Sequence, residues 1–393
     1  MWVNLGLRAS AEACAPICLV DPRSKTPTLF AYKWDLSLTL NSWLSLIYPT
    51  MSEDRIATAK LQKQAYEALA KYFKAHDKQV VEIEVLPPAI QPPDGILLQD
   101  GHCLGVPKKI LALAYIEARS RFFVNAKDGD YHSIALDATK VILLFDPEHL
   151  SAANFRKRRL VALQAETSLE EQFVYRKAVK YEFCFLDSIL TSPLHRQSKS
   201  PTLWYHRFWL LELLCPNSLQ GVPKQLRTDF WRTELSTVYK SGERHPKNYY
   251  AWQYARRLMD RIDDLQATTD CAQSVKAWCQ KHPSDISGWS FLAHLTAKLG
   301  RVSEREDLVR DVLRYAMKMQ SEHESLWVFI RIVLAHDALQ EGRAGVVSVL
   351  RKYGTEIESA GDRTVLFGRI QETLNWIGKH STPIEISHDL KSG

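Results

Sequence analysis

The sequence feature that most constrains the fold is an aromatic motif that occurs five times. Its most complete copy is the octapeptide His245–Trp252, and the other copies centre on Phe155, Trp204, Trp289 and Trp327. The central aromatics are separated by 49, 48, 37 and 38 residues. The last two intervals are close to the repeat length of about 34 residues that is typical of tetratricopeptide helix pairs. The chain is therefore predicted to be a repeat protein.

Four residues before each aromatic, the sequence favours the start of a helix. The residues at this position are Ser151, Ser200, Asn248, Asp285 and His323. Ser, Asn and Asp side chains accept hydrogen bonds from the first free N–H groups of a helix, so four of the five are preferred N-caps. Each aromatic then falls in a first helical turn and faces the partner helix. We expect each aromatic to hold one helix pair against its neighbour.

Helical periodicity also continues on both sides of the motifs. The stripe Val174–Ile189 predicts a long helix before Trp204, and two further helices are expected around Val346–Tyr353 and Leu366–Ile377. One strand-like run, Val80–Val85, precedes a proline-rich loop, and only helices are expected after residue 100. We predict an all-α fold. It is a right-handed α/α superhelix of helix hairpins, similar to tetratricopeptide repeats, with a short irregular N-terminal region.

Composition divides the chain into four predicted parts. They are a leader at 1–50, an N-terminal helical region with the proline-rich loop at 51–130, the repeats at 131–335, and capping helices with a tail at 336–393. The leader carries few charges and four prolines, so we expect it to be disordered, or the functional chain to begin at Met51. The two long repeat intervals place extra residues in turns near 191–200 and 215–225.

Composition also argues against several classes of function. The net charge of +6, from 51 Lys and Arg against 45 Asp and Glu, is too weak to indicate a nucleic-acid partner. No window approaches the ~20 apolar residues of a membrane span. The cysteines lack zinc-ligand spacing, and no phosphate-binding loop, dinucleotide-binding or nucleophile-elbow motif is present. We expect a soluble cytoplasmic protein that is not a self-contained hydrolase, kinase or dehydrogenase.

The motif copies resemble the protein prenyltransferase α-subunit repeat, whose typical form is Pro-x-Asn-Tyr-x-x-Trp-x-x-Arg-Arg. The octapeptide His245–Trp252 matches this form closely, and Ser200–Trp209 is similar to the form in Rab geranylgeranyltransferase α chains. In the first copy, Phe155 replaces Trp and is followed by Arg158 and Arg159. The resemblance covers about half of the chain.

The arginine columns depart from this family pattern. Arg207 keeps the arginine three residues after Trp204, but the last three copies have Ala255, Leu292 and Ile330 at this place. The chain therefore resembles the divergent prenyltransferase α-subunit repeat-containing proteins more than the α chains of farnesyltransferase or Rab geranylgeranyltransferase.

The resemblance implies the α-type, substrate-organising subunit of a heterodimeric protein prenyltransferase. Such an enzyme attaches a farnesyl or geranylgeranyl group to a cysteine of an acceptor protein, for example a small GTPase or a SNARE. The implied partner is a β subunit that holds Zn²⁺ and the isoprenyl diphosphate, so no cofactor is expected on this chain. The alternative is a non-catalytic helical-repeat scaffold for protein–protein interaction, which the lost arginines favour.

In the family, the Lys and Tyr of the Pro-Lys-Asn-Tyr repeat approach the diphosphate and the lipid. The matching residues here are Lys247 and Tyr249, with Tyr250 beside them. A lysine at a helix N-terminus can offset charge on a departing diphosphate, but Lys247 equally fits an exposed turn. The two tyrosines equally fit packing residues, and His206 fits a hydrogen-bonded histidine between helices better than a catalytic base. Packing and repeat architecture are the predicted roles of Phe155, Arg158, Arg159, Trp204, His206, Arg207, Asn248, Trp252, Arg256, Trp289 and Trp327.

Overall fold

The computed structural model describes residues 53–126, 131–165, 168–214, 224–262, 264–359 and 365–381. Contacts within the chain divide it into two units, Met1–Ile56 and Ala57–Gly393. The predicted leader at 1–50 and most of the turn expected near 215–225 lie outside the described residues.

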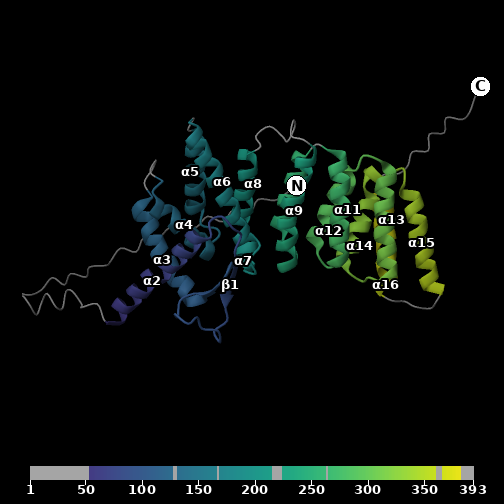
Figure 1. Ribbon diagram of the computed structural model, residues 1–393. Coiled ribbons are helices and arrows are strands. Elements are labelled where there is room, and N and C mark those ends of the chain that lie inside the picture. Colours follow the sequence, from purple (N-terminus) through teal and green to yellow (C-terminus); the bar gives the residue numbers. More distant parts are fainter. Residues whose placement is uncertain are drawn as a thin grey trace, which may run out of the picture. The chain divides into compact units, whose positions relative to one another are not determined.

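Most of the described chain is helical (Figure 1). The first helices in chain order are α2 (Glu53–Ala75), α3 (Lys108–Asn125), α4 (Ser133–Phe145), α5 (Leu150–Ala165), α6 (Leu169–Leu190), α7 (His195–Ser198) and α8 (Pro201–Leu214). They are followed by α9 (Lys224–Arg244), α10 (Tyr249–Arg261), α11 (Leu265–Lys281), α12 (Ile286–Lys298), α13 (Val302–Lys318) and α14 (Glu324–Ala335). A short 3₁₀ helix, Asp337–Leu339, precedes α15 (Arg343–Ser359) and α16 (Val365–His380).

The helices from α5 onward form two rows. Helices α5, α8, α10, α12, α14 and α16 contact one another in succession, and the five motif aromatics lie in the first five of them. Their hairpin partners α6, α9, α11, α13 and α15 form the second row. Stacked helix pairs of this kind bury a continuous core along the array. The predicted all-α helical-repeat fold is confirmed.

A small three-stranded sheet precedes the repeats. Strand β1 (Glu82–Leu86) pairs in parallel with β3 (Cys103–Pro107), and β2 (Leu98–Asp100) pairs antiparallel with β3, in the order β1-β3-β2. Only β1 had a sequence signal, and the expectation of helices alone after residue 100 is wrong at β3. Leu104, Gly105 and Val106 of β3 are consecutively buried, so no alternation of polar and apolar residues marks this strand.

The structure confirms three of the predicted N-caps. The side chains of Ser200, Asn248 and Asp285 accept hydrogen bonds from N–H groups in the first turns of α8, α10 and α12. His323 occupies the N-cap position of α14 but makes no side-chain cap bond. Ser151 lies inside α5, which begins one residue earlier, so its predicted capping role is wrong.

The first motif copy is shifted by two residues from its predicted register. His149 caps α5, because its imidazole accepts from Ala152 N–H and its carbonyl accepts from Ala153 N–H. Since the cap stands four residues before the motif aromatic in the other copies, Ala153 and not Phe155 occupies the Trp position. Phe155 then falls two residues after that position, where the third copy has Tyr254.

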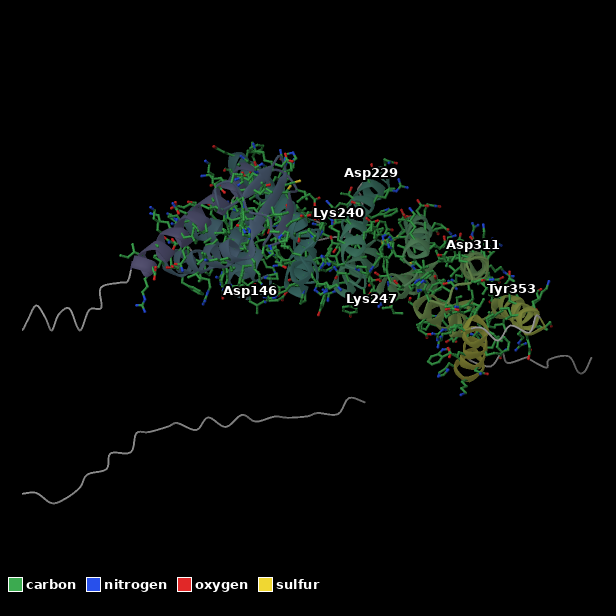
Figure 2. All side chains as sticks on the ribbon, turned by 90° about the horizontal axis from the view of Figure 1, so that it is seen from below. Asp146, Asp229, Lys240, Lys247, Asp311 and Tyr353 are labelled. Carbon is green, nitrogen blue, oxygen red and sulfur yellow. The ribbon has the colours of Figure 1, made fainter. Side chains whose placement is uncertain are left out.

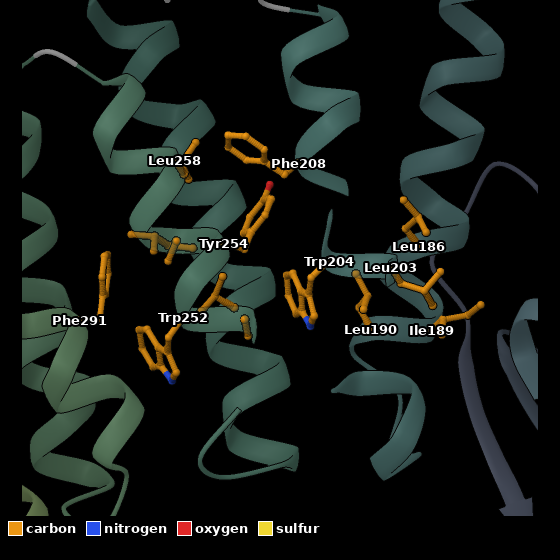
Figure 3. Packing of buried hydrophobic residues seen from close by; sticks show 14 of the residues in the cluster. Leu186, Ile189, Leu190, Leu203, Trp204, Phe208, Trp252, Tyr254, Leu258 and Phe291 are labelled. Atoms are coloured by element: carbon orange, nitrogen blue, oxygen red, sulfur yellow. The ribbon is translucent and has the colours of Figure 1, made fainter. Parts of the chain in front are cut away.

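An aromatic ladder connects the later copies. Three of the four motif tryptophans pack against the aromatic that lies two residues after the Trp of the next copy. The pairs are Trp204–Tyr254, Trp252–Phe291 and Trp289–Phe329, with ring centroids 5.3, 5.6 and 5.3 Å apart. Figure 3 shows the indole of Trp204 beside Tyr254 and that of Trp252 on the side of Phe291. All six side chains are buried, so the ladder joins successive helix pairs through the core.

Candidate functional site

The indole N–H groups of the motif follow one rule with one exception. Three of them donate to the backbone carbonyl six residues earlier: Trp204 to Ser198 at 2.8 Å, Trp289 to Pro283 at 3.0 Å and Trp327 to Ser321 at 2.7 Å. The buried indole N–H of Trp252 has no hydrogen-bond partner among the described residues. The carbonyl six residues earlier belongs to Pro246, and it accepts from the ammonium of Lys199 at 3.0 Å. The copy that matches the family form best therefore has a different turn.

Lys247 has an unusual backbone conformation in this turn. Its φ is +62°, in the left-handed region, where a non-glycine residue costs about 1–2 kcal/mol. The Lys247 N–H donates to the Asp285 carboxylate at 2.8 Å, and the other oxygen of that carboxylate caps α12. The next repeat thus holds the strained turn in place. The Lys247 side chain itself is exposed, at the edge of the helical array (Figure 2).

Asn248 anchors the start of α10 from inside the core. It is fully buried, and its Oδ1 accepts from Ala251 N–H at 3.3 Å. Its Nδ2 donates to the Ser198 carbonyl and the Ser241 hydroxyl, each at 2.9 Å. The amide therefore joins α10 to the α7 turn and to α9, and it fixes where the two residues after it point.

Tyr249 and Tyr250 point outward from this anchored helix start. They are 61% and 39% exposed, so the alternative of two buried packing residues is not supported. Both line a pocket of about 270 Å³ between α8 and α10. The other lining residues are Pro201, Trp204, Tyr205, Phe208, Gln253, Tyr254 and Arg257. Lys247 is not part of this lining. The pocket is therefore an aromatic one with a single cation, Arg257, among its lining residues.

The motif arginines form contacts within the chain. Arg207 is buried, and its guanidinium lies 2.5 Å from the carboxylate of Asp187 and 2.9 Å from that of Glu234. Arg256, on α10, donates to the carbonyl and the hydroxyl of Ser290 on α12, each at 3.2 Å. Neither guanidinium is presented to solvent as a free cation.

The two carboxylates around Arg207 compete for one positive charge. Burial raises the pKa of Asp187 to about 6, although the guanidinium opposes this shift. Burial alone lowers the pKa of Arg207, but the carboxylates of Asp187 and Glu234 raise it above its usual value. Tyr254 donates its hydroxyl to Glu234, and burial holds the pKa of this tyrosine well above 10. The cluster lies between α6, α8, α9 and α10 and holds four helices together.

In the first copy, the equivalent buried arginine is Arg156, which the sequence analysis missed. Its guanidinium makes a bidentate pair with Glu182, at 2.7 and 2.5 Å, and donates to Thr139 at 2.8 Å. The predicted Arg158 is exposed and Arg159 is half-buried. Burial and the nearby Arg156 lower the pKa of Arg159. The two-residue shift in register explains this difference, because Arg156 stands three residues after Ala153.

The lost arginines are replaced by apolar packing. Ala255, Leu292 and Ile330 occupy the same position in the last three copies, and all three are fully buried. No acidic residue is among the described buried residues of the later second-row helices α11, α13 and α15. A buried ion pair and a well-packed apolar cluster are close alternatives in stability. The loss of arginine is therefore a change of core chemistry and carries no functional information by itself.

His206 lies in the core and not at a reactive surface. It is fully buried, and its Nε2 lies 3.6 Å from Glu182 Oε1. Burial lowers the pKa of His206 to about 3. The imidazole is therefore neutral at physiological pH. It has no hydrogen bond from either ring nitrogen among the described residues, so the predicted hydrogen-bonded histidine is wrong in that detail.

This lowered pKa predicts an acid-dependent loss of stability. The unfolded chain takes up a proton on His206 near pH 6.5, whereas the folded chain does so only near pH 3. The stabilisation is thus complete above pH 6.5 and is lost as the pH falls toward 3. We expect the free energy of unfolding of the wild type, relative to His206→Gln, to fall by about 1.4 kcal/mol per pH unit below 6.5. Urea unfolding at pH 7, 6 and 5 measures this difference, and parallel pH profiles would contradict it.

Two further properties bear on the kind of site. Within the described ranges, no three His, Cys, Asp or Glu side chains gather closely enough to hold a metal ion. No helix in the described part of the chain is long and apolar enough to cross a bilayer. The fold and the site together define an all-α helical-repeat protein with an exposed aromatic edge at the start of α10.

Comparison with known proteins identifies the class of repeat. Geranylgeranyl transferase type-2 subunit alpha of Saccharomyces cerevisiae is 25% identical over 224 residues, 54% of this chain and 62% of the yeast protein. Human protein prenyltransferase alpha subunit repeat-containing protein 1 is 23% identical over 199 residues, 48% of this chain and 46% of that protein. The type-2 alpha subunit of Bos taurus is 29% identical over 279 residues, 66% of this chain and 44% of the bovine protein. This chain is a divergent relative of the protein prenyltransferase α-subunit repeat proteins.

The similarity is partial in two respects. The chain spans less than two thirds of the length of each of these relatives. The family described as the ECM9 middle domain matches residues 218–316, a stretch that contains the Trp252 and Trp289 copies.

Proposed function

We propose that this chain is the α-type, substrate-organising subunit of a heterodimeric protein prenyltransferase. The observation that carries the proposal is the outward-facing edge of α10. There, Lys247, Tyr249 and Tyr250 are all exposed, and the two tyrosines line an aromatic pocket, in a chain related to prenyltransferase α subunits. The partner would be a β subunit, and the location would be the cytoplasm.

The chemistry of the α10 edge fits an isoprenyl diphosphate approaching from a partner. Aromatic side chains that are partly exposed favour contact with an isoprenoid chain or with a protein surface. Lys247, two residues before Tyr249, supplies a mobile positive charge next to the N-terminus of α10. In the proposed reaction the acceptor thiolate attacks C1 of the isoprenoid, the C1–O bond breaks, and diphosphate leaves. The role of Lys247 is to offset the charge that develops on the diphosphate.

The groups that this role requires from the partner are a zinc ion and most of the lipid pocket. A zinc ion held by the partner would lower the pKa of the acceptor thiol and make the thiolate available near neutral pH. The acceptor is proposed to be a protein with a reactive cysteine, such as a small GTPase or a SNARE. Farnesyl and geranylgeranyl groups are both compatible with the α10 edge.

A second candidate function is a non-catalytic scaffold. It is favoured by the exposed tyrosines Tyr205, Tyr249 and Tyr250, which surround one pocket, because tyrosine is enriched where proteins bind proteins. The lost arginines do not favour it, since they reflect a change of core packing.

Co-purification and a reconstituted transfer assay separate the two functions. We expect the affinity-tagged full chain to recover a prenyltransferase β subunit from native cells, and the recovered pair to transfer an isoprenyl group to an acceptor protein. Lys247→Ala is expected to lower the rate of transfer by about tenfold or more, because the charge on the leaving diphosphate is no longer offset. The isolated chain is expected to have no transferase activity.

Two control variants make the result specific. Lys379→Ala removes an exposed lysine in the last turn of α16, three helices further along the row than α10, and should leave the rate unchanged. Lys247→Gly removes the same charge but relieves the left-handed strain, so a slower rate with equal or higher stability excludes a misfolded turn. Recovery of a partner other than a β subunit, with no effect of Lys247→Ala on any transfer, would establish the scaffold instead.

A further inference from the structure

The N-terminal half of α6 projects beyond the core. The first buried residue of this helix is Ala178, so about nine residues, or ~13 Å of helix, precede the core. The start of the projecting helix is stabilised, because Ser168 and Glu171 form a complete capping box there. The sequence placed Val174 in a buried stripe, but this side chain is 41% exposed. Among the hydrophobic residues of this half, only Tyr175 packs against the core, so its other side chains form a surface that the core does not use.

One face of this projection is apolar at its tip and basic behind it. Leu169 is 87% exposed, more than any other large hydrophobic residue in the described chain, and Phe173 is 68% exposed. Arg176, Lys177 and Lys180 follow them at helical spacing on the same face. An exposed Leu–Phe pair costs solvation free energy, so its presence on a capped helix end indicates a binding surface.

The cations of this face are not neutralised by the chain. We call four of these cations the α6 basic patch. They are Arg176, Lys177 and Lys180 of α6, and Lys78 from the turn after α2. Together with Phe173 and Tyr181 they line an open hollow of about 510 Å³, and no acidic residue of the described chain lines it. None of the four cations forms an ion pair with a described carboxylate. The Lys177 ammonium lies 5.5 Å from the ring centre of Tyr181, a contact that leaves its charge in place, so the patch presents four positive charges beside the apolar tip.

The acidic residues of the first turn do not cancel this charge. The carboxylate of Glu171 accepts from the hydroxyl and the N–H of Ser168. Glu170 stands one residue, about 100° around the helix, from Leu169, so it lies at the margin of the face.

We propose that the exposed half of α6 binds the surface of a membrane that contains anionic phospholipids. Leu169 and Phe173 enter the boundary between headgroups and acyl chains, and the α6 basic patch contacts the lipid phosphates. Eleven residues, or ~16 Å of helix, separate Leu169 from Lys180. This length accommodates a tip buried by about 5–10 Å with cations at headgroup depth. The proposal concerns α6 and not the α10 edge, so it stands independently of the proposed transferase role.

The shape of the face favours a bilayer over an acidic protein segment. A peptide ligand is held by side chains that line a groove, but Leu169 lies at the end of the helix and outside the hollow. A bilayer can bind both the protruding apolar tip and the α6 basic patch behind it, and it needs no groove of matching shape.

Co-sedimentation of the full chain with vesicles tests the proposal. We expect binding to vesicles of phosphatidylcholine with about one third phosphatidylserine, little binding to phosphatidylcholine alone, and release as the salt concentration rises. The triple variant Arg176→Gln/Lys177→Gln/Lys180→Gln should bind on the order of a hundredfold more weakly, from about fivefold for each lost cation. The double variant Leu169→Ser/Phe173→Ser should bind more weakly by at least about tenfold. Thermal unfolding should be unchanged in both, since the substituted side chains are exposed.

A matched control carries the same loss of charge elsewhere. Lys281→Gln/Lys318→Gln/Arg351→Gln removes three exposed cations from α11, α13 and α15 and should bind as the wild type does. Equal binding to neutral vesicles, or no effect of the α6 triple variant, would overturn the proposal. Full binding by the serine double variant would also overturn it, and would assign the patch to an acidic protein segment instead.

Discussion

Replacing Arg207 by methionine is expected to lower the free energy of unfolding by about 3–5 kcal/mol. The guanidinium is buried, and it is the shared partner of Asp187 and Glu234, at 2.5 and 2.9 Å. Methionine fills much of the same volume but leaves two carboxylates without a compensating charge in a region of low dielectric constant. Urea denaturation at pH 7 measures the loss.

The pH dependence of this variant identifies the cause. Without the guanidinium the two carboxylates have raised pKa values in the folded state, so the folded chain binds more protons than the unfolded chain. The difference in free energy of unfolding between the wild type and Arg207→Met should then be smaller at pH 5 than at pH 7. Arg158→Met removes an exposed arginine from α5 and should change stability by at most about 0.5 kcal/mol. A loss below about 1 kcal/mol for Arg207→Met would show that the cluster is effectively solvated.

Truncating Trp289 to alanine should cost a similar amount, about 3–5 kcal/mol. Trp289 is fully buried in the last pair of the aromatic ladder, packs on Phe329 and donates to the Pro283 carbonyl. Because each repeat contacts only its neighbours, the cavity weakens the joint between two helix pairs and not one helix alone. Urea unfolding followed by tryptophan fluorescence and by circular dichroism measures this cost.

A matched pair of conservative substitutions isolates the indole hydrogen bond. Trp327→Phe removes the bond to the Ser321 carbonyl, whereas Trp252→Phe removes a ring whose N–H has no partner in the described chain. We expect Trp327→Phe to cost about 1 kcal/mol more than Trp252→Phe. An equal cost for the two variants would mean that the Trp252 indole finds a partner in solution, such as a bound water.

Much of the repeat architecture could be predicted from the sequence. The spacing of the aromatics and the capping residues Ser200, Asn248 and Asp285 are local signals, and a helix start depends on a few neighbouring residues. The prediction failed in the first copy. There, the motif was aligned on Phe155, the most prominent aromatic residue. The helix cap His149 and the buried Arg156 place the motif two residues earlier.

The candidate site was less accessible to prediction. The motif predicted Lys247, Tyr249 and Tyr250 as site residues but not their exposure. Exposure depends on which neighbouring helices cover a residue, and the helical periodicity of the sequence does not specify those helices. The β3 strand was missed for a related reason, because a short strand that is buried throughout carries no alternating pattern.

By itself, the sequence determined that this chain forms stacked helix pairs, where most of the motif helices begin, and which aromatics are buried, because these properties follow from periodicity and from caps within a few residues. Tertiary structure alone decided three other properties. They are the left-handed turn at Lys247, the pairing of Arg156 and Arg207 with buried carboxylates, and the exposure of the first half of α6. Each depends on contacts, or on their absence, between segments that lie tens of residues apart in the chain.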